Sequence, residues 1–169
     1  AYQKQRRAPI LLKQAEAAEA EGKAGRAVEL LRLYLAIRPN EAGAWADYAR
    51  LLADGADPNL GRDQVYAVVV KALKLKGEDE GLERRRAEIA MELGRFEDAR
   101  DGLSRLIARR GEDPRGQAEL EELRARVEAA DGKFNDAEVW LLMAVGHDPH
   151  RVSAHARLAG LLRRNLDDP

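Results

Sequence analysis

Three short stretches of the chain resemble one another: GKAGRA at residues 22–27, GRFEDA at residues 94–99 and GKFNDA at residues 132–137. Each follows a stretch rich in Ala, Glu and Arg and precedes another stretch with apolar residues at helical spacing. Glycine readily adopts the backbone conformation that ends a helix, and the alanine five residues later allows two helices to approach closely. The three stretches therefore predict tight turns between paired α-helices.

Small residues recur around these turns at a regular interval. On the helices that precede the turns they are Ala15, Ala49, Ala87, Ala125 and Ala159. On the helices that follow they are Ala27, Val65, Ala99 and Ala137. Neighbouring positions in each series are 34 or 38 residues apart. Intervals of this size are typical of helical-repeat arrays, so we expect a 34-residue unit with occasional four-residue insertions.

The residues around the turns resemble the tetratricopeptide repeat, whose pattern is W-x2-L-G-x2-Y, then A-x3-F, then P. The first half of that pattern is matched by Trp45, Tyr48, Ala49 and Leu52. The second half is matched twice, by Ala27, Leu31 and Pro39 and by Ala137, Leu141 and Pro149. The resemblance covers residues 8–166 and implies an all-α, right-handed α-α superhelix, a solenoid of tandem helix–turn–helix repeats.

In this frame residues 1–169 form a single domain. We expect repeats at about 8–41, 42–79, 80–117 and 118–151, followed by a closing helix at 152–166. Helices are predicted at 8–21, 24–37, 42–54, 62–76, 80–93, 96–109, 117–131, 134–147 and 150–165. Residues 65–76 are rich in β-branched residues and partly alternate like a strand, but a lone strand would have no pairing partner, so we predict a helix.

The frame also predicts which residues are buried. These are Ala15, Leu31, Ala49, Leu52, Ala87, Phe96, Ala99, Leu103, Ala125, Phe134, Ala137, Leu141 and Leu158. Charged residues replace large apolar ones on the first helices of the third and fourth repeats, namely Glu83, Arg86, Glu121, Arg124 and Glu128. We expect these two helices to be shifted or to pack more loosely than the family pattern implies.

Composition narrows the class of protein. Hydrophobic residues make up 45% of the 169 residues and the net charge is −1, which argues against disorder and against a basic nucleic-acid-binding surface. A basic cluster at the start, Lys4, Arg6, Arg7 and Lys13, is interpreted as a solvated chain end rather than a membrane contact. No apolar run approaches the ~20 residues that span a bilayer. Because the chain begins at Ala1, we expect a soluble domain excised from a longer, or membrane-anchored, protein of unknown location.

No catalytic, cofactor or metal site is predicted. The chain has no cysteine, no phosphate-binding glycine loop and no nucleophile–base arrangement, so we expect no enzyme activity. The three histidines, His147, His150 and His155, are candidate metal ligands, but the repeat frame places them at a helix end, in a turn and at a packing position. Residues 54–61 contain Asp, Asn, Pro and Gly without the spacing of a calcium loop, which indicates a surface loop.

The resemblance implies a scaffold that binds a protein or peptide, because the first helices of such arrays line a concave groove. The expected partner-binding residues are Arg50, Arg84, Arg85, Glu88, Met91, Arg126 and Arg157. Arginine can grip a carboxylate with two hydrogen bonds, although these arginines can also simply pair with neighbouring glutamates. The alternative function is a structural spacer or a self-assembly segment of a larger protein, which has no groove ligand and makes contacts through its convex face or its open ends. Trp140 either packs against the following helix or forms an exposed contact point.

Overall fold

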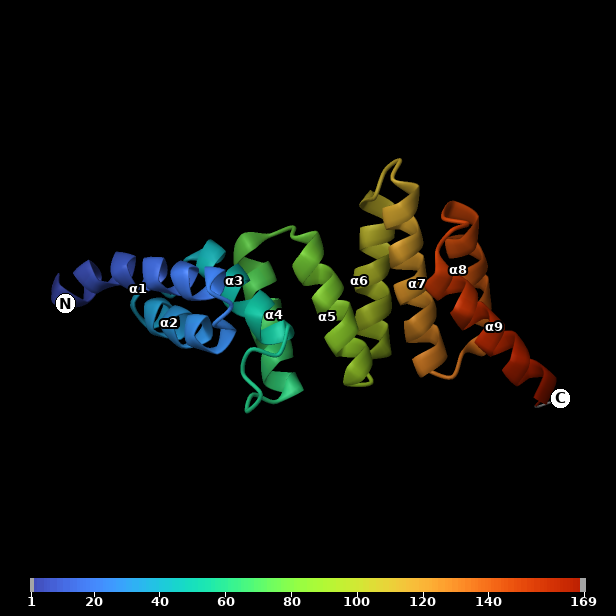
Figure 1. Cartoon of the computed structure of the whole chain (residues 1–169), viewed down its shortest axis with the longest axis horizontal. Coiled ribbons are helices and arrows are strands. Elements are labelled where there is room, and N and C mark those ends of the chain that lie inside the picture. Colours follow the sequence, from blue (N-terminus) through green and yellow to red (C-terminus); the bar gives the residue numbers. More distant parts are fainter. Residues whose placement is uncertain (1, 168–169) are drawn as a thin grey trace. The chain divides into compact units, whose positions relative to one another are not determined.

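The computed structural model describes the backbone of residues 2–167 and the side chains of residues 7–164, so the side chains of Lys4 and Arg6 lie outside the described residues. Within the described backbone there are nine α-helices and no strand (Figure 1). They are α1 (Tyr2–Ala20), α2 (Ala24–Ile37), α3 (Ala42–Ala53), α4 (Arg62–Lys76), α5 (Glu80–Glu92), α6 (Phe96–Arg109), α7 (Pro114–Ala130), α8 (Phe134–His147) and α9 (Val152–Asp167). The predicted all-α class is confirmed, and residues 65–76 are helical.

The helix bounds agree with the predicted ones to within three residues, except at the start of α1. That helix begins at Tyr2, six residues earlier than predicted, and runs through Pro9. A proline usually marks the first turn of a helix, and this is why the sequence pattern placed the start near residue 8. Helix α7 starts at Pro114, where the missing N–H of proline costs nothing, and the Asp113 carboxylate accepts a hydrogen bond from the Gly116 backbone N–H at 3.1 Å.

The predicted turns share one backbone geometry. Gly22, Gly94 and Gly132 all have positive φ values, at 73°, 70° and 77°. In each turn the N–H of the next residue donates to a carbonyl five residues earlier, for example from Lys133 to Glu128 at 2.8 Å. The same bond follows Gly55, which the sequence pattern assigned only to an insertion. These Schellman turns end each helix and send the chain back along it.

The helices group into two compact units, residues Ala1–Ile89 (unit 1) and Ala90–Pro169 (unit 2). In unit 1, α1 packs on α2, and α3 packs on α4. In unit 2, α7 packs most extensively on α8 and also contacts α6, and α8 contacts α9. The single continuous domain expected from the sequence stays a prediction.

Most of the predicted core is buried. Ten of the thirteen expected residues are buried, among them Ala99 and Leu103, which are both 0% exposed. The exceptions are Phe96, Phe134 and Leu158, which are half-buried. Phe96 and Phe134 are the first residues of α6 and α8, and a side chain at a helix end is surrounded by fewer neighbours. Leu158 packs against a core cluster here called the α7–α9 core cluster, which consists of Ala118, Ala125, Ala137, Leu141, Ala144 and Ala154.

The expectation that α7 packs loosely is wrong, because its charged residues are buried and paired. Glu121, Glu122 and Glu128 are only 0%, 5% and 2% exposed. Each bonds a different neighbour. Glu121 accepts from His147 on α8, and Glu128 accepts from Arg100 on α6. Glu122 accepts from three residues at or near the start of α9, namely Arg151, Ser153 and Arg157. A buried charge is tolerated when it is paired and hydrogen-bonded. The glutamates thus fix α7 against three other helices.

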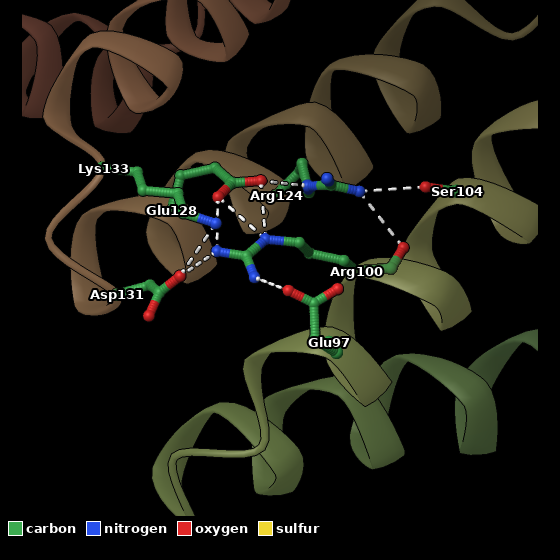
Figure 2. A network of polar contacts seen from close by, with 7 residues as sticks. All are labelled: Glu97, Arg100, Ser104, Arg124, Glu128, Asp131 and Lys133. Atoms are coloured by element: carbon green, nitrogen blue, oxygen red, sulfur yellow. Dashed lines mark hydrogen bonds and ion pairs between the residues drawn. The ribbon is translucent and has the colours of Figure 1, made fainter.

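The contacts around Arg100 show how this works (Figure 2). Glu128 accepts hydrogen bonds from the Arg100 guanidinium at 2.9 and 2.8 Å and from Arg124 Nε at 2.7 Å. Arg100 also bonds Asp131 and, at 2.7 Å, the exposed Glu97. Burial alone would raise the pKa of Glu128, but the bonds from Arg100 and Arg124 hold that pKa below its ordinary value. The cluster therefore holds a carboxylate ionised inside the α6–α7 junction.

Candidate functional site

Unit 2 contains a cleft of about 500 Å³, here called the unit 2 cleft. It is lined by Met91 at the end of α5, by Ala125, Arg126, Ala129 and Ala130 on α7, by Leu141 on α8, and by Arg157, Gly160, Leu161 and Arg164 on α9. The α9 positions are three, four and seven residues apart and so form one stripe on that helix. Three of the four α7 positions are alanine, and residue 160 on α9 is glycine. These small residues leave space between α7 and α9.

Gly160 shows that this space is open. A Cβ atom built on Gly160 meets no other atom within 4 Å, so a side chain at this position would project into free volume. The large apolar side chains of the lining, here called the apolar floor, are Met91, Leu141 and Leu161. A concave site with an apolar floor and a few polar groups is the usual form of a ligand-binding site.

The charged groups that line the unit 2 cleft are all arginines, namely Arg126, Arg157 and Arg164. Arg157 donates from Nε to Glu122 Oε1 at 2.9 Å, and its side chain is 48% exposed. The Arg164 guanidinium lies over the Phe134 ring at 3.9 Å from the ring centroid, which favours one orientation of the arginine. Arg126 has no ion-pair partner among the residues whose side chains are described.

Glu122 on α7 does not line this cleft but binds Arg157, which does. Its carboxylate accepts from Arg151 Nε at 2.5 Å, from the Ser153 hydroxyl at 2.8 Å and from Arg157. Burial would raise the pKa of Glu122, but the three donors outweigh burial and keep that pKa lower than usual. The ionised glutamate thereby holds Arg157 through Nε, and this bond does not use the two terminal nitrogens of that arginine.

Unit 1 contains a smaller cleft of about 260 Å³, the unit 1 cleft. It is lined by Ala46, Asp47, Arg50, Asp54, Lys76, Asp79, Gly81, Leu82 and Arg85. Its charges pair with one another: Arg85 with Asp54 at 2.7 Å, and Lys76 with Asp79 at 2.7 Å. The hydrogen bond from Lys76 holds the pKa of Asp79 below its ordinary value.

Arg50 is held at the same cleft by carboxylates on two helices. It bonds Glu19 of α1 at 2.7 Å and lies 3.6 Å from Asp47 of α3. The bond to Glu19 raises the pKa of Arg50. The unit 1 cleft is therefore largely neutralised by its own residues, unlike the unit 2 cleft.

The predicted partner-binding residues fall into two groups. Arg50 and Arg85 line the unit 1 cleft, whereas Met91, Arg126 and Arg157 line the unit 2 cleft. Glu88 bonds Arg85 at 3.0 Å without lining the unit 1 cleft, and Arg84 is half-buried outside both clefts. The alternative interpretation, in which arginines pair with neighbouring carboxylates, holds for Arg50, Arg85 and Arg157.

The sequence-based prediction missed Arg164, which lines the unit 2 cleft. Its signal was present, because Arg164 lies seven residues after Arg157 and therefore two turns further along the same helix face. The prediction had followed the family frame only through the first turns of α9.

The three histidines do not come together. His147 Nδ1 is 2.8 Å from Glu121 Oε2, and His155 Nε2 is 2.9 Å from the Pro149 carbonyl oxygen. The His150 backbone N–H donates to Asp148 at 3.2 Å. In the described part of the chain no three His, Asp or Glu side chains form a group able to hold a metal ion. Trp140 is half-buried against the α7–α9 core cluster, with the Arg124 guanidinium 5.3 Å from its ring centroid.

No helix within the described residues is both long and apolar enough to cross a membrane. No protein-family model matches the sequence, and no curated protein matches it significantly.

Solved structures resemble the chain closely in fold and weakly in sequence. MamA (residues 41 to the end) from Desulfovibrio magneticus RS-1 is 18% identical, with a TM-score of 0.79 over 95% of this chain and 86% of that one. YrrB, described as a TPR protein with an unusual peptide-binding site, is 14% identical, with a TM-score of 0.71 over 94% and 77%. TTC0263, a thermophilic TPR protein of Thermus thermophilus, is 19% identical, with a TM-score of 0.61 over 90% and 79%. These likenesses, added to the repeat pattern and the paired helices, identify the fold of the chain as that of the tetratricopeptide-repeat proteins.

Proposed function

We propose that the chain is a non-enzymatic scaffold that binds an extended segment of a protein partner on its first helices. The proposed contact residues are those predicted from the sequence, Arg50, Arg84, Arg85, Glu88, Met91, Arg126 and Arg157, joined by Arg164. The unit 2 cleft carries the proposal, because it combines an apolar floor, arginines and a volume of about 500 Å³. The peptide-binding description of YrrB, which shares the fold, supports the same class of function.

A side chain placed in the unit 2 cleft tests this proposal. Gly160→Leu should fill the cleft without unfolding the protein, because a Cβ at Gly160 meets nothing within 4 Å and leucine favours helix more than glycine does. Gly146→Leu is the matched control, since Gly146 is also helical, exposed and open around its Cβ, but lies on α8 away from the cleft.

The wild type and both variants would be used as bait in extracts of the source cells. A partner retained by the wild type and by Gly146→Leu, and lost with Gly160→Leu, is the expected result. A partner retained equally by all three proteins would move the interaction away from the unit 2 cleft. Absence of any partner would contradict the scaffold function.

A second function, self-assembly as a structural segment, is favoured by one feature of α8. Val139, Leu142 and Met143 are 56%, 53% and 41% exposed. Their spacing of three and four residues places them on one helix face, where an apolar stripe in contact with water is unfavourable. Sedimentation equilibrium would test it: a concentration-dependent mass that is lost in Leu142→Glu supports self-assembly, and a monomer at every concentration contradicts it.

A further inference from the structure

We infer that the unit 2 cleft selects acidic peptide segments, in which one apolar side chain is flanked by aspartate or glutamate. This inference rests on the proposed function and adds the chemistry of the partner. It follows from the charges, the floor and the spacing of the cleft.

The charge of the unit 2 cleft is not compensated by its own lining. Arg126, Arg157 and Arg164 line it, and no aspartate or glutamate does. The unit 1 cleft offers the comparison within the same chain, since its three basic residues are matched by Asp47, Asp54 and Asp79. Glu122, which does not line the cleft, pairs with Arg157. Arg126 and Arg164 have no carboxylate partner among the described side chains, so the cleft keeps a positive potential that favours an anionic ligand.

The three arginines differ in how they are held, and each retains N–H groups that bind no carboxylate of the described side chains. Arg157 uses only Nε for its bond to Glu122. The Arg164 guanidinium lies over the Phe134 ring, and in this contact no carboxylate accepts from its N–H groups. Arg126 bonds no carboxylate among the described side chains. A ligand carboxylate can therefore form charge-assisted hydrogen bonds without first breaking an internal ion pair.

The floor and the spacing define the rest of the ligand. Met91, Leu141 and Leu161 offer apolar contact between α7 and α9, which fits an aliphatic or aromatic side chain. Arg157 and Arg164 are seven residues apart on α9, which corresponds to roughly 10 Å along the helix. The two guanidinium groups are also held by different partners, Arg157 by Glu122 and Arg164 by Phe134, so two separate acidic side chains fit them better than a single chain terminus does.

A library of random eight-residue peptides displayed on phage is the probe that tests this inference. It would be selected on the wild-type chain, and each enriched peptide would then be synthesised and measured by fluorescence polarisation. Arg126→Glu should weaken binding at least about tenfold, since one charge-assisted pair is lost and replaced by repulsion. Arg163→Glu is the control, because Arg163 is exposed on the same helix as Arg164 but does not line the cleft.

Two changes in the peptide complete the test. Replacing its Asp and Glu by Asn and Gln should weaken binding at least about tenfold, and this loss should shrink in about 0.5 M salt. Amidating its C-terminus should change affinity less than about twofold, because the cleft is matched to side-chain carboxylates. A large loss on amidation would overturn the side-chain assignment.

The outcomes separate this inference from the proposed function. Enriched acidic–apolar peptides that lose affinity in Arg126→Glu support both. Enriched peptides without acidic residues, or acidic ones insensitive to Arg126→Glu, overturn the inference and leave peptide binding intact. A selection that enriches nothing contradicts the proposed function itself.

Discussion

Replacement of Glu128 by glutamine is expected to destabilise unit 2 more than any exposed charge change does. The substitution keeps the size of the side chain and removes the charge that two arginines share, at distances of 2.7 to 2.9 Å. Removing one partner of a buried pair costs roughly 3–5 kcal/mol. We expect about 3 kcal/mol, near the lower end of that range, because Asp131 and Glu97 still neutralise Arg100.

The control uses a second carboxylate on the same arginine. Glu97 bonds Arg100 at 2.7 Å, but its side chain is 82% exposed, whereas that of Glu128 is 3% exposed. Glu97→Gln should therefore cost about 1 kcal/mol or less. Burial is the main difference between the two pairs.

Urea unfolding followed by tryptophan fluorescence measures both changes. The chain has two tryptophans, Trp45 in unit 1 and Trp140 in unit 2, so a Trp45→Phe background reports on unit 2 alone. Free energies that differ by less than about 1 kcal/mol between Glu128→Gln and Glu97→Gln would contradict this account of the two pairs. Replacing Arg100, Arg124 and Glu128 together by methionine should recover most of the lost stability, because an apolar cluster then replaces the whole network.

Three further predictions concern unit 2. Ala99→Arg should cost about 3 kcal/mol or more, because Ala99 is 0% exposed, whereas Ala108→Arg on the same helix should be nearly neutral in thermal unfolding, because Ala108 is exposed. The folded-state pKa of Glu122 lies below its ordinary value of 4.5, so the unfolded chain binds more protons below that pH. Stability measured by urea titration should therefore fall as the pH decreases from about 4.5, and less steeply in Glu122→Gln. Asp113→Ala should remove the cap of α7 and shift the unfolding midpoint to a lower urea concentration in the same titration, whereas Glu112→Ala, one residue earlier, should have little effect.

Helix positions could be predicted from the sequence because they depend on local signals. Gly22, Gly94 and Gly132 mark turns whose geometry requires a positive φ, and the alanines around them set the helix pairs. Residues 65–76 were the difficult case, since their local preference favours a strand. Packing against α3 overrides that preference.

The polar core of α7 could not be predicted in the same way. A glutamate at a packing position indicates a mismatch until its partner is known, and the partners of Glu121, Glu122 and Glu128 come from three other helices. Their sequence separations of 26 to 35 residues carry no local pattern. The clefts could not be predicted for the same reason. The repeat frame assigns Arg85, Arg126 and Arg157 to one groove, whereas Arg85 lies neutralised in the separate unit 1 cleft.

The ion pair between Arg100 and Glu128 also affects how this array can be rearranged by recombination. In the repeat frame, the position of Glu128 is held in the other first helices by Ala18, Leu52, Ala90 and Leu162. A gene product in which the third repeat was joined to any of those helices would bury the Arg100 charge against an alanine or a leucine. This junction therefore penalises both the gain and the loss of a repeat between α6 and α7, because either event separates Arg100 from Glu128. The order of the third and fourth repeats is thereby protected by the energetics of a single carboxylate.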